Sequence, residues 1–159
     1  MADKVLKRMA QVGVIVEDLE TAIKGFSEDF GVTEWFRLDI NETFGELLID
    51  GKPDMLNVKV AINKEFGVEI ELVQPTGEGK YMDWLQEHGP GVHHMAFTMP
   101  DKNARFNEMI QREIDNGRQP WIHATEKTGE EGKKMNFAYL DRRADMGVIM
   151  EMYGEDDKE

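Results

Sequence analysis

The sequence contains an internal repeat, and this repeat constrains the fold more than any other feature. Residues 11–18, QVGVIVED, align with residues 94–101, HMAFTMPD, at an offset of 83. Residues 67–72, GVEIEL, align with residues 147–152, GVIMEM, at an offset of 80. Because the two offsets are nearly equal, we expect two copies of one structural unit, each roughly half of the chain.

Each copy has the same expected order of elements, a strand, a helix and then further strands. In the first copy residues 9–16 alternate as a strand does, Asp18 is placed to cap a helix, and Gly31 to end it. In the second copy the strand covers 92–99, and a helix follows from Pro100 to Asn116. The remaining extended segments are expected at 34–38, 44–49, 56–62, 68–74, 119–124, 135–140 and 148–153.

The repeat predicts an α+β fold in which paired βαβββ modules form one curved, cupped, mostly antiparallel sheet with helices on the outer face. One copy could not cover its own sheet well, so the two are expected to pack as a pseudo-symmetric pair in a single domain over residues 1–159. Its expected parts are listed in chain order: module one at about 9–75, a linking helix at about 78–88, module two at about 92–153, and an acidic tail at 154–159.

The charge balance argues against several classes of function. The chain has 19 basic and 32 acidic residues, a formal net charge of −13, which repels phosphate backbones and anionic lipids. We therefore expect no nucleic-acid partner and no membrane partner. With no cysteine, no spanning apolar stretch and no signal-like amino terminus, a cytoplasmic location is expected.

Strand alternation places four polar residues on the sheet face that the helices do not cover. Val12, Val14 and Val16 share one face of the first strand, so Gln11 lies on the other. The same alternation places Glu71, His94 and Glu151 on that concave face. The alternative is that such side chains are merely solvated, but all four fall at repeat-equivalent positions. An amide, an imidazole and two carboxylates are suited to metal binding or proton transfer.

Neighbouring polar residues lack this repeat support. Glu69 and Glu46 are expected to be surface charges, and His93 points away from His94 and is expected to be structural.

Four segments resemble the vicinal oxygen chelate superfamily of glyoxalase, bleomycin-resistance and dioxygenase proteins, and within it the methylmalonyl-CoA epimerases. They are residues 69–75 (EIELVQP), 91–97 (GVHHMAF), 132–137 (GKKMNF) and 147–151 (GVIME). The resemblance implies paired βαβββ modules around a metal or ligand cavity. It spans about residues 10–153.

The resemblance implies a metal-ligand set of Gln11, Glu71, His94 and Glu151. His94 and Glu151 match the epimerases, whereas Gln11 stands where they have a histidine and Glu71 where they have a glutamine. Their second catalytic carboxylate corresponds to Asn57. The set glutamine, glutamate, histidine, glutamate is also similar to that of glyoxalase I. The implied cofactor is one divalent Co, Mn, Ni or Zn ion. A metal-free pair of carboxylates is the alternative.

The implied activity is that of an isomerase, a racemase or epimerase that removes and returns a proton beside a carbonyl through an enolate. Glu151 and Glu71 are the expected catalytic residues. The substrate is either a thioester like methylmalonyl-CoA or a planar ketone such as an isoflavanone, as in dihydrodaidzein racemases. Two alternatives are a lactoylglutathione lyase and a non-catalytic drug-binding protein of the bleomycin-resistance type.

The sequence also offers candidate residues for contacts with the substrate. Asn57 and four aromatic residues are candidates for the substrate pocket: Trp35, Phe44, Trp84 and Trp121. A patch of four cations is a candidate for the phosphates of CoA, with a solvated loop cluster as the alternative: Lys133, Lys134, Arg142 and Arg143. The expected partner is a small molecule with a carbonyl, and the chain is expected to form a homodimer.

Overall fold

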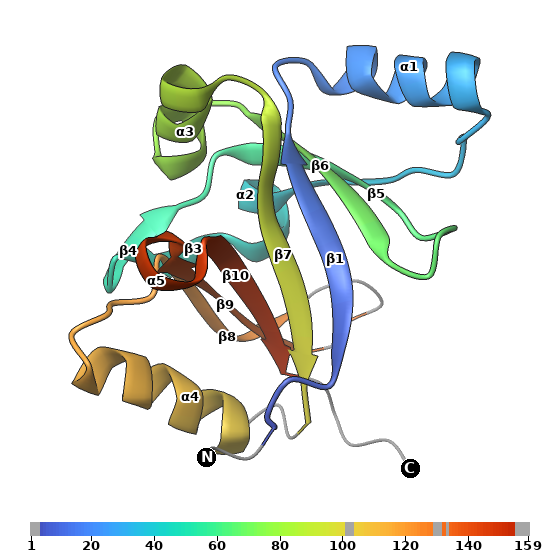
Figure 1. Cartoon of the computed structure of the whole chain (residues 1–159). Coiled ribbons are helices and arrows are strands. Elements are labelled where there is room, and N and C mark those ends of the chain that lie inside the picture. Colours follow the sequence, from blue (N-terminus) through green and yellow to red (C-terminus); the bar gives the residue numbers. More distant parts are fainter. Residues whose placement is uncertain (1–3, 101–103, 129–131, 133, 155–159) are drawn as a thin grey trace. The chain divides into compact units, whose positions relative to one another are not determined.

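The structure, a computed structural model, describes residues 4–100, 104–128, 132 and 134–154 (Figure 1). This part of the chain forms strands and helices in the following order: β1 (Arg8–Ile15), α1 (Leu19–Phe30), β2 (Phe36–Asp39), α2 (Ile40–Phe44), β3 (Glu46–Ile49), β4 (Lys52–Met55), β5 (Val58–Asn63), β6 (Glu69–Pro75), α3 (Lys80–His88), β7 (Gly91–Met99), α4 (Ala104–Asp115), β8 (Ile122–Thr128), β9 (Lys134–Arg142), α5 (Arg143–Met146) and β10 (Val148–Gly154). The fold is α+β, as the sequence predicts, and the sheet is mixed, with antiparallel pairs and the parallel pairs β1–β6 and β7–β10.

The chain divides into two compact units that are not continuous in sequence. Unit one comprises Met1–Ala10, Glu46–Met55 and His94–Glu159, and unit two comprises Gln11–Gly45 and Leu56–His93. Two strands pass from one unit into the other, β1 at Gln11 and β7 at His94. Each unit is therefore described by itself.

Unit two contains the strands β2, β5, β6 and β1 in that hydrogen-bonded order, with α1 on one face. β1 and β6 are parallel, whereas β5 pairs antiparallel with both β2 and β6. Helix α1 begins where the Asp18 side chain accepts a hydrogen bond from the Thr21 N–H at 2.7 Å, and it ends at Gly31 with φ 71°. Its buried Leu19 and Ile23 pack against Ala61 and Leu72.

Unit one contains β7, β10, β9, β8, β3 and β4 in that order. Helix α4 packs on one face of β7, β10 and β9. β7 and β10 are parallel, and β9 pairs antiparallel with both β10 and β8. The core beneath α4 joins Phe106 and Ile110 of the helix to Met99, Leu140 and Met152 of the sheet. Burial of this apolar helix stripe stabilises α4 more than its helix propensity does.

The internal repeat is confirmed at the level of strand register. In unit two Gly13 is the register partner of Glu71, and in unit one Ala96 is the partner of Glu151. Adding 83 to 13 gives 96 and adding 80 to 71 gives 151, so the two sequence offsets map one pairing onto the other. The order β2-β5-β6-β1 therefore has its counterpart in β8-β9-β10-β7.

The connection between the second and third expected strands differs from the prediction. Residues 44–49 were expected as one strand, but Phe44 ends the short helix α2, and β3 forms a hairpin with β4. Asp50 and Gly51 form its turn with φ values of 51° and 77°, the combination that tight hairpin turns require. The hairpin belongs to unit one, where β3 pairs with β8.

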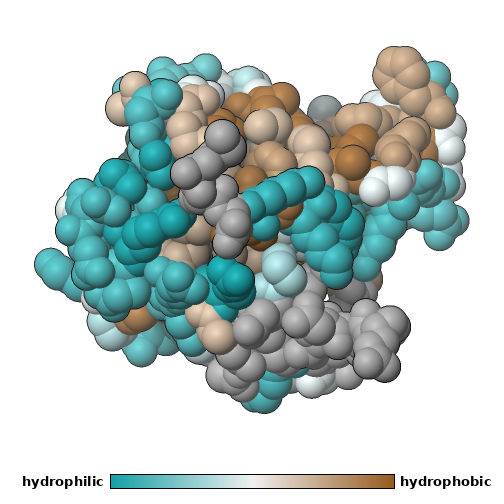
Figure 2. Space-filling view, turned by 60° about the horizontal axis from the view of Figure 1, so that its bottom comes forward, coloured by the Kyte–Doolittle hydropathy of each residue, from teal (hydrophilic) through white to brown (hydrophobic). Residues whose placement is uncertain are grey.

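The surface agrees with the acidic composition. In Figure 2 hydrophilic residues cover much of the visible face, with apolar residues gathered in a smaller area. Among the helices of the described residues, none has both the length and the apolar character needed to cross a membrane.

A buried glutamate ties α4 to the sheet in unit one. Glu113 is 2% exposed and accepts hydrogen bonds from Arg118 at 2.7 and 2.9 Å, while Arg142 lies 3.3 Å from the same carboxylate. Arg142 also contacts Asp145 at 2.5 Å. The hydrogen bonds from Arg118 lower the pKa of Glu113, and that from Arg142 lowers the pKa of Asp145. Both carboxylates therefore favour the folded state only while ionised.

We predict that Glu113→Gln lowers the free energy of unfolding by about 2 kcal/mol at pH 7, because it leaves two guanidinium groups without their shared anion. The pKa of Glu113 is lowered in the folded state, so this stabilisation is complete above the ordinary value of 4.5 and is lost as pH falls below it. Urea unfolding at pH 7 and pH 3 measures both effects. Glu108→Gln, an exposed site on the same helix, is the control, and an equal loss there would contradict this account.

Candidate active site

The four polar residues predicted to share a face are all buried. Gln11 is 1% exposed, Glu71 7%, His94 1% and Glu151 2%. The alternative of a solvated outer face is therefore wrong for every one of them. Ionisable side chains are seldom buried to this degree unless they have partners, so their surroundings decide what they can do.

In unit one, His94 and Glu151 form a direct pair on neighbouring strands. His94 Nε2 lies 3.3 Å from Glu151 Oε2. The imidazole also meets the Tyr139 ring edge to face, with centroids 4.9 Å apart. Tyr139 lies on β9 directly opposite Glu151, so one tyrosine contacts the histidine and neighbours the carboxylate along the sheet. The arrangement leaves His94 little freedom to turn.

In unit two, Gln11 lies on β1 and Glu71 on the parallel strand β6. Glu69, also on β6, contacts Gln11. Gln11 Nε2 donates a hydrogen bond of 3.0 Å to Glu69 Oε2. Glu69 was expected to be a surface charge. Its side chain is 33% exposed, and it also holds the buried amide of Gln11. The register of β1 and β6 makes Glu69 the partner of Gln11. Strand alternation alone does not give this register, so the contact could not be predicted from it.

A small residue lies opposite each candidate catalytic carboxylate. Gly13 is the register partner of Glu71, and Ala96, which is fully buried, is the partner of Glu151. In each case the parallel neighbour presents almost no side chain beside the acid.

The donor set fits a divalent metal ion. Glu71, His94 and Glu151 each offer one ligand atom and together could hold an ion. Carboxylate oxygen and imidazole nitrogen suit borderline or hard ions such as Mn, Co, Ni or Zn.

The family follows from the comparison with known sequences. The model of the Glyoxalase/Bleomycin resistance protein/Dioxygenase superfamily matches residues 10–137, most of the chain. The chain belongs to this superfamily. The match includes Gln11, Glu71 and His94 and ends before β10, which carries Glu151. The α+β sheet agrees with the fold that the resemblance implies.

Solved structures with this fold include proteins of known and unknown activity. A methylmalonyl-CoA epimerase from Streptomyces coelicolor, in complex with 2-nitronate-propionyl-CoA, is 21% identical with a TM-score of 0.66, covering 94% of this chain and 98% of its own. The epimerase from Mycobacterium tuberculosis is 18% identical with a TM-score of 0.59, covering 97% and 91%. A hypothetical protein from Bacillus halodurans C-125 is 21% identical with a TM-score of 0.62, covering 96% of each chain. At these identities the likeness establishes the fold. No curated protein sequence matches.

The aromatic candidates for the substrate pocket lie in different surroundings. Trp35 packs against the α1 core and donates its indole N–H to the Val32 carbonyl at 3.0 Å, on the sheet face opposite Gln11. Trp84 of α3 contacts the His93 ring at 4.8 Å. Phe44 ends α2 and Trp121 precedes β8, both half-buried. The four do not form one wall within either unit.

His93 and His94 have separate environments, as the sequence predicts. The His93 ring is buried against Tyr81 and Trp84 of α3, with ring centroids 4.8 Å from each. This is the packing of a structural histidine within unit two.

The candidate cation patch is largely engaged in ion pairs. Arg142 contacts Glu113 and Asp145, and Arg143 contacts Asp141 at 2.7 Å. Lys134 is exposed at the start of β9, and Lys133 lies outside the described residues, as does the tail at 155–159. The two arginines would have to leave acidic partners before they could bind phosphate.

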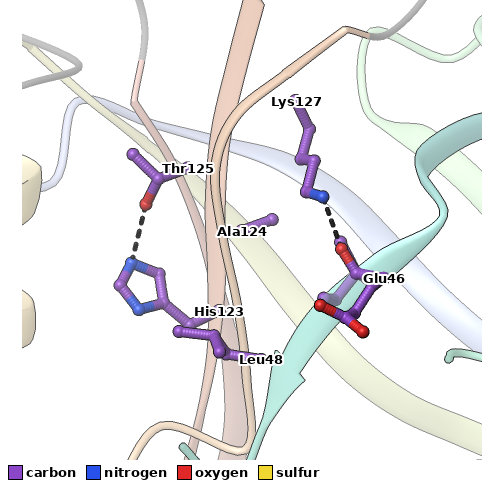
Figure 3. Close-up of a pocket in the computed structure, with 7 residues that line it drawn as sticks. Glu46, Leu48, His123, Ala124, Thr125 and Lys127 are labelled. Atoms are coloured by element: carbon purple, nitrogen blue, oxygen red, sulfur yellow. Dashed lines mark hydrogen bonds between the residues drawn. The ribbon is translucent and has the colours of Figure 1, made fainter. Parts of the chain in front are cut away.

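A separate surface depression of about 240 Å³ lies between β3 and β8 in unit one (Figure 3). In it Thr125 Oγ1 lies 3.1 Å from His123 Nε2, and the Lys127 ammonium donates to the Glu46 carbonyl. Burial lowers the pKa of His123, so its imidazole is neutral at pH 7. None of the four predicted polar residues lines this depression.

Asn57 is held at both ends of its amide. Its Oδ1 accepts a hydrogen bond from Asn41 Nδ2 at 3.0 Å, and its Nδ2 donates to the Glu78 carbonyl at 3.2 Å. These bonds tie α2 to the segment before α3.

We predict that Asn57→Asp lowers the free energy of unfolding by about 1–2 kcal/mol, because a carboxylate cannot donate to the Glu78 carbonyl. Chemical denaturation measures this loss, and Asn41→Ala, which removes the other bond, is expected to act in the same direction. A variant with unchanged stability and weakened substrate binding would instead assign Asn57 to substrate recognition alone.

Proposed function

We propose that this protein is an isomerase, a racemase or epimerase that exchanges a proton at a carbon beside a carbonyl through an enolate. The observation that carries the proposal is the burial of two glutamates, Glu71 and Glu151, at repeat-equivalent register positions. The superfamily supports it, and so do structural neighbours that are themselves methylmalonyl-CoA epimerases.

In this proposal Gln11 and Glu71 from one repeat, and His94 and Glu151 from the other, face one cavity. Glu151 removes the proton from one side of the substrate carbon, and Glu71 supplies a proton from the other side. A planar enolate between two such groups loses its chirality, which is the stereochemical result that a racemase needs. His94, held by Tyr139, positions Glu151. A well-placed acid or base contributes about 10²–10⁴ in rate.

The proposed cofactor is one divalent Co, Mn, Ni or Zn ion held by Gln11, Glu71, His94 and Glu151. Such an ion, when bound, supplies Lewis-acid stabilisation of the developing negative charge. The alternative is a metal-free pair of glutamates in which mutual repulsion keeps one of them protonated.

For the substrate, the ion pairs of Arg142 and Arg143 favour a planar ketone such as an isoflavanone over a CoA thioester. A CoA ester brings several phosphate charges to a chain of net charge −13, and two of the candidate cations are already paired with acids. A methylmalonyl-CoA-like thioester stays the second candidate, because the neighbouring epimerases act on that class of molecule by name.

A glyoxalase I-like lyase is the second candidate function. It is favoured by the buried set of glutamine, glutamate, histidine and glutamate, which is similar to the glyoxalase I ligand set. It requires a glutathione hemithioacetal and gives a lactoyl thioester, so the product identifies it.

We predict that the protein washes deuterium from heavy water into the carbon beside the carbonyl of its substrate, and that Glu151→Gln reduces this exchange at least 100-fold while substrate binding is retained. Mass spectrometry of a panel of chiral isoflavanones and CoA esters measures exchange together with loss of optical activity. Glu17→Gln, an exposed glutamate just after β1, is the matched control. Binding without exchange in the unaltered protein would indicate a non-catalytic binder of the bleomycin-resistance type.

We also predict that treatment with a chelator abolishes exchange and that added Co or Mn restores it. The unaltered protein, assayed before and after metal removal, gives the readout. Exchange that persists after complete metal removal would establish the metal-free glutamate pair in place of the metal site.

A further inference from the structure

The hydrogen bond between Gln11 and Glu69 fixes which end of the Gln11 amide is presented. A carboxylate can only accept hydrogen bonds, so the amide NH₂ group must face it. Gln11 Oε1 is therefore directed away from Glu69. Because Gln11 is 1% exposed, its amide has no bulk water in which to turn over freely.

Glu69 lies next to Gln11 on the neighbouring strand and also makes a long, exposed ion pair. It is the register partner of Gln11 across the parallel strands, and its other carboxylate oxygen lies 3.9 Å from Lys64 Nζ. The Glu69 side chain is 33% exposed, so it is partly solvated. It is thus a carboxyl acceptor placed behind a buried amide.

The second repeat has neither the amide nor the carboxylate at the equivalent positions. The offset of 83 maps Gln11 onto His94, and the offset of 80 maps Glu69 onto Ile149, which is 1% exposed. The carboxylate of Glu69 therefore lies beside the glutamine, whereas the apolar Ile149 takes its place beside the histidine. We expect this difference if the function of Glu69 is to orient the Gln11 amide.

We propose that Glu69 is a positioning residue that makes Gln11 an oxygen donor to a bound cation. The role rests on the proposed function, because it concerns the metal site of that function. With its NH₂ group held by Glu69, Gln11 presents a carbonyl oxygen, which suits a metal ion and not an anionic substrate oxygen. Residues behind a ligand commonly govern metal affinity by orienting the ligand.

The test is the affinity of metal-stripped protein for Co²⁺, measured by isothermal titration calorimetry without substrate. In Glu69→Gln the new amide can donate to the Gln11 carbonyl, so the Gln11 amide can turn over and present NH₂. We expect the affinity for Co²⁺ to fall about 10–100-fold. Lys64→Gln, which removes only the exposed charge next to Glu69, is the matched control and is expected to change the affinity less than about threefold.

A double-mutant cycle separates orientation from charge. If Glu69 acts through the Gln11 amide, Glu69→Gln has no further effect on Co²⁺ affinity once Gln11→Ala is present. An equal loss in both backgrounds would mean that Glu69 acts by its charge alone and would overturn the proposal, as would unchanged affinity in Glu69→Gln. Failure of the unaltered protein to bind Co²⁺ would also overturn it, whereas the racemase proposal would still stand or fall on deuterium exchange.

Discussion

The first and last strands of each repeat pair in parallel, β1 with β6 and β7 with β10. This pairing determines where the helices and the candidate site residues lie. Parallel neighbours cannot be joined by a tight turn, so the chain must leave the sheet between them, and α1 and α4 lie in these connections. The same pairing places Gln11 beside Glu69 and Ala96 beside Glu151. A shift of one residue in either register would move the candidate acid to the helix-covered face.

The two repeats use this shared frame differently. The residue opposite Glu151 on the antiparallel neighbour is Tyr139, whereas the residue opposite Glu71 is Ile62. One glutamate thus lies among polar and aromatic groups, with an imidazole 3.3 Å away, and the other lies beside an aliphatic side chain. Duplication explains why there are two acids, and in the proposed function the divergence of their neighbours gives each acid a distinct part in proton transfer.

Much of the fold could be predicted from sequence because it follows from alternation and from the repeat. Asp18 and Gly31 bound α1 as expected. The four polar residues chosen by alternation, Gln11, Glu71, His94 and Glu151, are all buried, and their role in a site stays a prediction. The β3–β4 hairpin was not predicted, although Asp50-Gly51 is a hairpin-turn sequence. Proline is uncommon inside strands, so Pro53 gives β4 a weak strand signal, and the pairing of β3 with β8 is long-range.

The part played by Glu69 could not be predicted for a different reason. Its position on the strand is consistent with a solvated charge, and only the register of β1 and β6 brings it to the Gln11 amide. The ion pairs of Arg142 likewise depend on α4 packing against the sheet, since Glu113 is 29 residues away in sequence. Local patterns specify which residues share a face, whereas partners across the sheet depend on tertiary packing.

Anomalous diffraction from crystals grown with cobalt tests most directly whether the two repeats build a single metal site. We expect one strong peak within about 2.0–2.2 Å of an oxygen from each of Glu71 and Glu151 and of a nitrogen from His94. A cobalt peak elsewhere, together with Glu71 and Glu151 opening into separate cavities, would contradict the view that the two repeats build a single site.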